Sequence, residues 1–258
     1  MGSGAMMGTF LLFLSLLVMG AMLILRGRRG PAPSIRPLPA FQDVEVETGY
    51  AAESGGAVHV ALGSGSIYGE DALTSLAALH VVGSLAELGI SYSAPPIVTV
   101  GDPTLLPLAQ DALRRAYEQV GASEMYDPDR VRFIAPTPIA YAAGAAHIVA
   151  TDEITANMMA GSFGPEASLI ADAGARRAIS QLGAVAAPDA VGVLYPATER
   201  LAVGEELYAA GAQLTEKRRY SISLVVEDIL RVVVVLAIFG SAVMVAVFGP
   251  EVMALLGM

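Results

Sequence analysis

The sequence of 258 residues has no cysteine and no tryptophan, and only 16% of its residues are charged. The missing cysteines exclude disulfides, thiolate zinc sites, iron–sulfur clusters and a cysteine nucleophile. Soluble domains carry about a quarter charged residues, whereas 54% of this chain is hydrophobic and its mean hydropathy is +0.58. The composition therefore indicates that part of the chain lies in lipid, and it excludes disorder as the main state.

Basic residues are also few, with 15 Lys and Arg against 25 Asp and Glu and a net charge of −10. A nucleic-acid partner needs a positive surface against its phosphates, so we expect no nucleic acid to bind. Between residues 37 and 216 the balance is 7 basic to 22 acidic residues. The middle of the chain is therefore strongly acidic, and we expect it to stand away from anionic lipid headgroups.

Two long uncharged runs lie near the chain ends, at residues 2–25 and 232–250. Each is long enough for one membrane span of about 20 residues. Arginines follow the first run instead of preceding it, so a cleaved signal peptide is not expected. The sequence predicts one transmembrane helix in residues 1–26 and a second within 217–250, followed by a short tail at 251–258.

The basic residues that flank the predicted spans all lie on the side facing the middle of the chain. They are Arg26, Arg28, Arg29 and Arg36 after the first span, and Lys217, Arg218, Arg219 and Arg231 before the second. By the positive-inside rule, the middle domain is then cytoplasmic and both termini are outside. These side chains are expected to contact the anionic headgroups of the lipid bilayer.

Small residues recur at four-residue spacing in both predicted spans. Gly4 and Gly8 lie in the first, and Ala237 and Ser241 lie in the second. Such faces allow helices in a membrane to approach closely. We expect the spans to pack against each other or between protomers, which favours a homo-oligomer.

Between the spans, composition divides the chain into a linker and a domain. Residues 27–42 are rich in proline and arginine, with four prolines in residues 31–39, and predict a stiff extended linker. Residues 43–216 are long enough for one domain of ordinary size.

Short apolar strands alternate with amphipathic helices in this domain. Strands are expected at 57–62, 96–100, 131–134 and 156–160, and helices at 70–88, 105–120, 140–149, 165–175 and 204–214. The pattern in residues 178–203 indicates one further strand and is otherwise ambiguous. The alternation predicts an α/β fold, a Rossmann-like and mostly parallel sheet with helices on both faces.

Ligands of open parallel sheets bind past the carboxyl ends of the strands. The candidates for such a crevice are Gly63, Ser64, Gly65, Ser66, Glu70, Asp71, Asp102, Thr104, Thr137, Ser162 and Glu166. The glycines at 63, 65 and 69 are spaced one residue longer than the dinucleotide fingerprint, and no acidic residue is placed to hold a ribose. Nucleotide binding at this helix start is therefore the alternative, and helix-start glycines are the simpler interpretation.

Catalytic and metal motifs are missing from the sequence. It has no G-x-S-x-G elbow and no evident Ser-His-Asp set. His59, His80 and His147 show no metal-ligand spacing, and each lies in an apolar pattern typical of core or interface residues. The carboxylate pairs at 70–71 and 152–153 fit helix starts better than an ion or acid–base site. The strand end at 101–104 places the Asp102 carboxylate at the crevice, and an Asx-Pro turn explains this residue equally well. We predict no metal and no cofactor, and no catalytic residue is identified.

Four segments resemble a family of bacterial membrane proteins known as a domain of unknown function. They are residues 101–111, 140–144, 161–166 and 204–212. The resemblance implies a bacterial inner membrane, an architecture and no activity. It makes the loops 101–104 and 161–166 the first places to look for a ligand.

The leading hypothesis is a membrane-anchored cytoplasmic α/β domain without enzymatic activity. It would act as a self-associating scaffold, as an assembly subunit of a larger membrane complex, or as a ligand sensor. The alternative is a membrane-tethered enzyme or nucleotide-binding protein that uses the crevice around residues 63–66 and Asp102.

Overall fold

The computed structural model describes residues 37–214. It also describes a few isolated positions, each of them helical, at 12, 15, 16, 19, 20, 231, 232, 234, 235, 238, 239 and 243. The chain divides into two compact units, one of residues 36–215 and one formed by residues 1–35 together with 216–258. Both predicted spans fall almost wholly outside the described residues. So do their packing residues and all their flanking basic residues except Arg231.

Among the described residues, one helical stretch is long and apolar enough to cross a membrane, Gly69–Ser91. In its most apolar window, 61% of the residues are buried inside the domain. Such burial is typical of a core helix, because a helix that packs on all sides within a domain is apolar all round.

A six-stranded sheet forms the centre of the domain, with the order β3-β2-β1-β4-β5-β6 and every neighbouring pair parallel. The strands are β1 (Ala57–Gly63), β2 (Ile97–Val100), β3 (Val131–Phe133), β4 (Ile154–Ser162), β5 (Ser180–Val185) and β6 (Arg200–Val203). β1 and β2 are buried along their whole length, as strands covered on both faces must be. The predicted parallel α/β sheet is confirmed.

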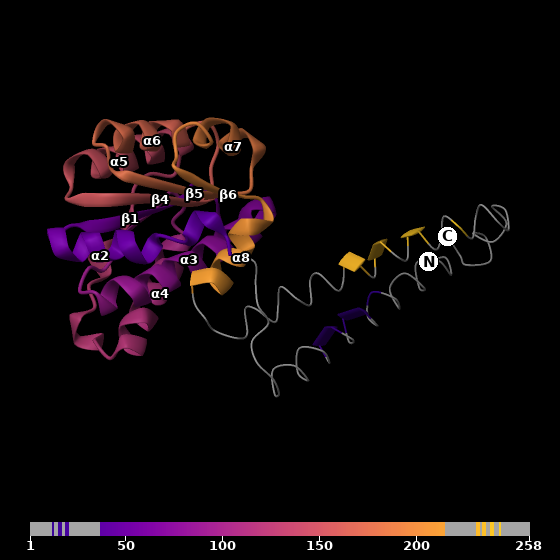
Figure 1. Cartoon of the computed structure of the whole chain (residues 1–258), viewed down its shortest axis with the longest axis horizontal. Helices are drawn as coiled ribbons and strands as arrows, with labels where there is room; N and C mark the ends of the chain where they lie inside the picture. Colours follow the sequence, from indigo (N-terminus) through magenta and orange to yellow (C-terminus); the bar gives the residue numbers. More distant parts are fainter. Residues whose placement is uncertain are drawn as a thin grey trace. The chain divides into compact units, whose positions relative to one another are not determined.

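Helices cover both faces of the sheet (Figure 1). One face carries α2 (Val44–Ser54), α3 (Ala72–Ser91), α4 (Leu105–Val120) and α8 (Glu205–Leu214), and the other carries α5 (Pro138–Thr151), α6 (Ala167–Arg176) and α7 (Pro188–Leu194). Two large apolar clusters separate accordingly, one under each layer of helices. Short 3-10 turns η1 to η4 occupy Pro39–Phe41, Gly69–Asp71, Ser123–Met125 and Pro128–Arg130.

Four elements differ from the sequence-based expectation. α2, α7 and β6 were not expected. α2 buries only Val44, Thr48 and Ala51 and has a weak apolar pattern, α7 has only seven residues, and β6 has four. The prediction of an extended linker is wrong at η1, which forms a short helical turn. The side chain of Phe41 in this turn is buried, with 4% of its surface exposed. Proline fits this turn because the first position of a helix needs no backbone N–H.

The strand order places a switch point between β1 and β4. From β1 the chain continues to β2 on one side, and from β4 it continues to β5 on the other. The carboxyl ends of such a central pair are where open parallel sheets bind their ligands. α3 and α8 both begin at this edge, where the hydroxyls of Thr74 and Tyr208 lie 3.2 Å apart.

Both boundaries of the domain lie side by side at the opposite edge. The backbone N–H of Leu38 donates to Oε1 of Gln213, near the end of α8, at 3.4 Å. Asp43 forms an ion pair with Arg200, the first residue of β6. The chain therefore enters and leaves the domain together, at the amino-terminal edge of the sheet.

Replacing Ala178 with glycine is expected to stabilise the folded domain. This exposed residue follows α6 with φ of +51°, a left-handed conformation that costs a residue with a Cβ about 1 kcal/mol. Ala178→Gly should therefore raise the free energy of unfolding by roughly 0.5–1 kcal/mol in urea titrations of the detergent-solubilised chain. Ala175→Gly, inside the last turn of α6, is the control and should lower it by a similar amount.

Candidate functional site

The loops after β1, β2 and β4 meet at the switch point. The N–H of Gly101 donates to the carbonyl of Gly63 at 2.9 Å, and the N–H of Ser64 donates to the carbonyl of Ser162 at 3.1 Å. These backbone bonds extend the sheet by one residue past its strands. The structure thus brings the candidate residues of loops 63–66, 102–104 and 162–166 to one edge.

Glycine at position 63 is required by both its conformation and its surroundings. Its φ is +79°, and a Cβ built there would lie 1.9 Å from the carbonyl oxygen of Ser162. Gly161, on the neighbouring strand, would place a Cβ 2.2 Å from the carbonyl oxygen of Leu62. The two central strands approach more closely at their ends than any side chain permits.

Gly65 lies at the meeting point of three oxygen-bearing side chains. A Cβ at Gly65 would be 2.6 Å from Cβ of Ser162, 2.9 Å from Oγ of Ser75 and 3.1 Å from Cβ of Asp71. The Ser162 hydroxyl donates to Oδ1 of Asp71 at 2.6 Å. Ser75 is fully buried, and within residues 37–214 its hydroxyl finds no hydrogen-bond partner.

Other candidates of the crevice stabilise their own loops. Oδ1 of Asp102 accepts from the backbone N–H of Thr104 at 2.8 Å and from its hydroxyl. Oε1 of Glu166 accepts from the N–H of Gly164 at 2.8 Å, and the Ser66 hydroxyl closes a turn with the backbone of Tyr68. The Asx-turn interpretation of Asp102 therefore agrees with the structure.

The carboxyl-end edge of the sheet is acidic throughout. Its loops and helix starts carry Glu70, Asp71, Asp102, Glu166, Asp189, Glu205 and Glu206. The seven arginines of residues 37–214 lie elsewhere, at Arg114 and Arg115 in the second half of α4, at Arg130, Arg132 and Arg200 around strand starts, and at Arg176 and Arg177 at the end of α6. An edge with this charge attracts cations and repels phosphate.

A row of buried polar side chains crosses the sheet beneath the crevice, on the face of α5 and α6. Nδ1 of His59 lies 2.8 Å from Oδ1 of Asn157, and Nδ2 of Asn157 donates to Oε1 of Gln181 at 3.3 Å. On the other side, Nε2 of His59 lies 3.0 Å from the Thr99 hydroxyl, which lies 3.0 Å from the Tyr141 hydroxyl. We call these five residues the polar row.

Hydrogen-bond chemistry fixes the direction of the polar row from Gln181 to the Thr99 hydroxyl. The Gln181 amide donates to the carbonyls of Ala171 and Ala197, so its Oε1 must accept from Asn157. Oδ1 of Asn157 then accepts from Nδ1–H of His59, which leaves Nε2 to accept from Thr99. At the far end, the Tyr141 hydroxyl accepts from the N–H of Gly63 at 3.2 Å. The row therefore ties the first loop of the crevice to the interior.

Burial keeps both titratable members of the polar row uncharged. Desolvation lowers the pKa of His59 to about 4, with the Asn157 hydrogen bond acting in the opposite direction. Burial likewise raises the pKa of Tyr141 to about 12. At neutral pH, His59 is a neutral imidazole with both nitrogens bonded, which confirms its assignment as a satisfied core residue. His80 and His147, by contrast, lie on exposed helix positions.

Acidification should destabilise the domain through His59. The unfolded histidine takes up a proton below pH 6.5, whereas the folded one resists protonation until about pH 4. Stability is therefore lost as the pH falls from 6.5 to 4, by about 1.4 kcal/mol per pH unit. Urea titrations from pH 7 to 4.5 should show this slope in the native chain, and His59→Gln should flatten it; equal slopes would contradict the assignment.

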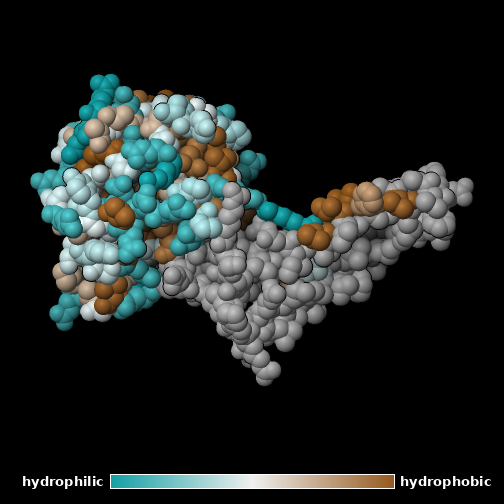
Figure 2. Space-filling model, in the orientation of Figure 1, coloured by the Kyte–Doolittle hydropathy of each residue, from teal (hydrophilic) through white to brown (hydrophobic). Residues whose placement is uncertain are grey.

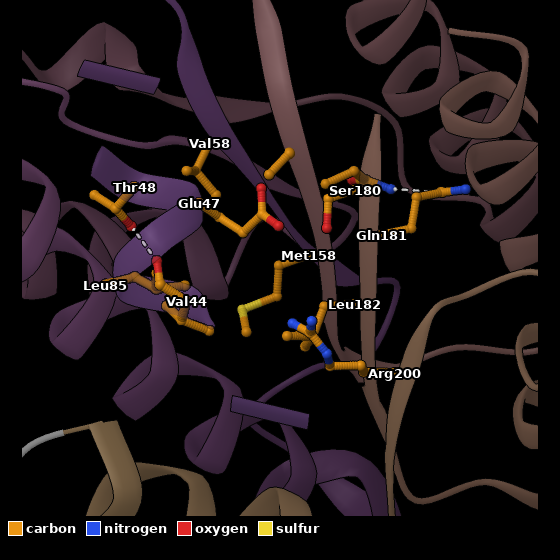
Figure 3. Close-up of a pocket in the computed structure, with 12 residues that line it drawn as sticks. Val44, Glu47, Thr48, Val58, Leu85, Met158, Ser180, Gln181, Leu182 and Arg200 are labelled. Carbon is orange, nitrogen blue, oxygen red and sulfur yellow. Dashed lines mark hydrogen bonds between the residues drawn. The ribbon is translucent and has the colours of Figure 1, made fainter. Parts of the chain in front are cut away.

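A narrow pocket lies at the other edge of the sheet, beneath α2 (Figure 3). Val58, Leu85, Met158 and Leu182 contribute its apolar lining, while Glu47 and Arg200 point toward its centre. Arg200 is already paired with Asp43, and the Thr48 hydroxyl donates to its own helix at Val44. Few polar groups remain there to orient a ligand, and none of the crevice candidates lines the pocket.

Apolar side chains on the domain surface are scattered. The face shown in Figure 2 is mostly hydrophilic, with separate hydrophobic patches. The most exposed large apolar residues come from different elements, for example Tyr68, Ile139 and Tyr195. Scattered exposure of this kind is ordinary for a globular surface.

Sequence reasoning missed the polar row and Ser75. One signal was present: a large polar residue lies within each of three mostly apolar strands, His59 in β1, Asn157 in β4 and Gln181 in β5. Their alignment in one row depends on the strand register, which pairs residue 59 with 157 and 157 with 181. Within the described ranges, no group of three or more His, Asp or Glu suits a metal ion.

Comparison with known proteins gives one match. A family model described as a domain of unknown function, DUF6754, matches residues 3–255. No curated protein and no solved structure matches the chain.

Proposed function

Because the chain belongs to the DUF6754 family, a domain family described without an activity, we propose its function from geometry: a ligand-sensing α/β domain held to a membrane by both ends. The ligand binds at the carboxyl-end crevice between β1 and β4. The observation that carries the proposal is the buried, unpartnered hydroxyl of Ser75 at the switch point of the sheet.

Three features of the crevice support a ligand there. Parallel sheets with this strand order bind their ligands at the switch point. The loops at this point are drawn together by glycines and fixed by hydrogen bonds, so a ligand meets preformed groups. The polar row anchors Gly63 to the interior and gives the site a rigid base.

A sensor is favoured over an enzyme by what the crevice residues do. The carboxylates of Asp102 and Glu166 are engaged in their own turns. The buried histidine of the polar row is a neutral, fully bonded group beneath the loops. This arrangement suits a site that binds and orients a ligand through fixed groups.

The membrane tether rests on the uncharged runs at residues 2–25 and 232–250 and on their flanking basic residues. Within the domain, its two boundaries lie side by side, at Leu38 and Gln213, on the edge of the sheet opposite to the crevice.

Binding is tested on the full chain in detergent by thermal unfolding with ATP, NAD, MgCl₂, CaCl₂ and spermidine at matched ionic strength. A ligand at a hundred times its Kd adds about 2.7 kcal/mol, a rise of roughly 5–10 °C for a domain of this size. At least one compound is expected to give such a rise. The absence of any rise would overturn the proposal.

The cytoplasmic position of the domain is tested by labelling a single introduced thiol, which is feasible because the chain contains no cysteine. Ala175→Cys introduces a single thiol at an exposed position of α6. In sealed bacterial spheroplasts, a membrane-impermeant maleimide should label it only after the cells are opened. Labelling of intact spheroplasts would contradict a cytoplasmic domain, and recovery of the protein in the soluble fraction would contradict the tether.

A further inference from the structure

Two leucines occupy outward positions at the start of α3. Leu73 and Leu76 are 69% and 44% exposed, and residues three apart share one face of a helix. The opposite face of α3 packs on the sheet, where Ala78 lies beside Gly161 of β4. The outward face of a helix in a globular domain ordinarily carries polar side chains. Two exposed leucines on this face therefore indicate a surface that another molecule covers.

Tyr208 of α8 continues this apolar surface. Its hydroxyl lies 3.2 Å from the hydroxyl of Thr74, the residue that follows Leu73, and Tyr208 is 44% exposed. The first turns of α3 and α8 thus lie side by side on one face of the sheet (Figure 1). The other exposed apolar residues of the domain are scattered, whereas these three lie on adjoining helical turns. We call Leu73, Leu76 and Tyr208 the α3–α8 face.

Carboxylates surround the α3–α8 face. Glu70 and Asp71 come directly before α3, and Glu205 and Glu206 begin α8. Glu70 and Asp71 are exposed and form no ion pair within residues 37–214. The arginines of the same residues all lie elsewhere. The α3–α8 face therefore combines exposed apolar side chains with negative charge.

We infer that the α3–α8 face binds a basic amphipathic segment of another protein. Apolar side chains of that segment pack against Leu73, Leu76 and Tyr208, and its Lys or Arg side chains pair with the carboxylates around them. Three apolar side chains form a small interface core, so we expect the binding to be weak and transient. The inference goes beyond the proposed function, because it holds whether or not a small ligand binds in the crevice.

The charge of the α3–α8 face favours this partner over three others. A symmetric dimer uses the same patch on both subunits, so a second copy docked through this face would bring the same carboxylates together. Like charges opposite each other across an interface disfavour binding. Anionic lipid headgroups and nucleic-acid phosphates are repelled for the same reason. A cationic protein segment with one apolar side matches both properties of the face.

The experiment is site-specific photo-crosslinking in cells that make the protein naturally, with benzoylphenylalanine placed at Leu73 or Leu76 of the full chain. The crosslinked peptides are sequenced by mass spectrometry. We expect adducts with another protein, through a segment that carries Lys or Arg beside apolar residues at helical spacing. Adducts with a second copy of the chain, with lipid or with a segment that lacks basic residues would overturn the inference, as would the absence of adducts.

Leu169 is the matched control position for the crosslinker. This leucine of α6 is also 44% exposed, but it lies on the other face of the sheet. Benzoylphenylalanine at Leu169 should give no adduct with the same segment. Equal crosslinking from this position would show that contact is not specific to the α3–α8 face and would overturn the inference.

The role of charge is measured with the crosslinker at Leu76. Glu70→Gln together with Glu206→Gln should lower the yield of the adduct roughly fivefold, as the loss of two surface ion pairs does. Glu53→Gln together with Glu124→Gln removes two exposed carboxylates from other parts of the domain. This control should leave the yield within about twofold, because it changes only screened, longer-range attraction. Equal effects of the two double variants would contradict a docking site that recognises basic side chains.

Discussion

Gly63→Ala is expected to lower the free energy of unfolding of the α/β domain by about 4 kcal/mol. The added Cβ carries about 1–2 kcal/mol of left-handed strain at φ +79°. It also lies 1.9 Å from the backbone oxygen of Ser162, and overpacking against backbone costs about 1–3 kcal/mol more. Urea titration of the detergent-solubilised chain, followed by circular dichroism, measures the loss.

Gly69→Ala separates the two contributions. Gly69 has a similar φ of +71°, but a Cβ there has no atom within 4 Å. This variant should lose only the strain, about 1 kcal/mol. Equal losses in the two variants would show that the close approach of β1 and β4 is not what requires glycine at position 63.

Asn157→Leu is expected to cost about 3 kcal/mol by breaking the polar row at its centre. Leucine keeps the branched shape of asparagine, but it leaves Nδ1–H of His59 and Oε1 of Gln181 without partners in the interior. Each buried group left unpaired costs about 1–3 kcal/mol. The same urea titration at pH 7.5 measures this loss.

Thr48→Val is the control for the polar row, because the Thr48 hydroxyl is also buried but donates only within its own helix, to Val44 at 2.7 Å. It should cost less than about 1 kcal/mol. A double variant, His59→Leu with Asn157→Leu, should cost less than the sum of its two single variants. Strict additivity would contradict the row as a connected network.

The fold was largely accessible from the sequence because its signals are local. The strands at β1, β2 and β4 are mostly apolar runs, and the helices between them have clear starts, so the alternation alone predicts a parallel sheet. The sequence pattern did not predict α2, because only three of its eleven residues are buried. It did not predict β6, because four residues carry too little periodicity to identify a strand.

The candidate site was only partly accessible, because it depends on contacts between distant residues. The edge and its loops follow from the rule for parallel sheets, which placed Gly65 and Ser162 at one end of the sheet. Their approach to Ser75, in the first turn of α3, depends on the tight packing of the first loop against β4. No sequence pattern marks a serine as unpaired, so Ser75 emerged only from the structure.

Amide hydrogen exchange on the full chain in lipid nanodiscs tests whether a ligand binds at the switch point. The chain is compared alone and with spermidine, ATP or MgCl₂. We expect at least one compound to protect peptides covering residues 61–75 and 160–168, the loops that meet around Gly65. Protection confined to peptides around the α2 pocket, at residues 44–58 and 180–200, or no protection with any compound, would contradict a ligand site at the switch point.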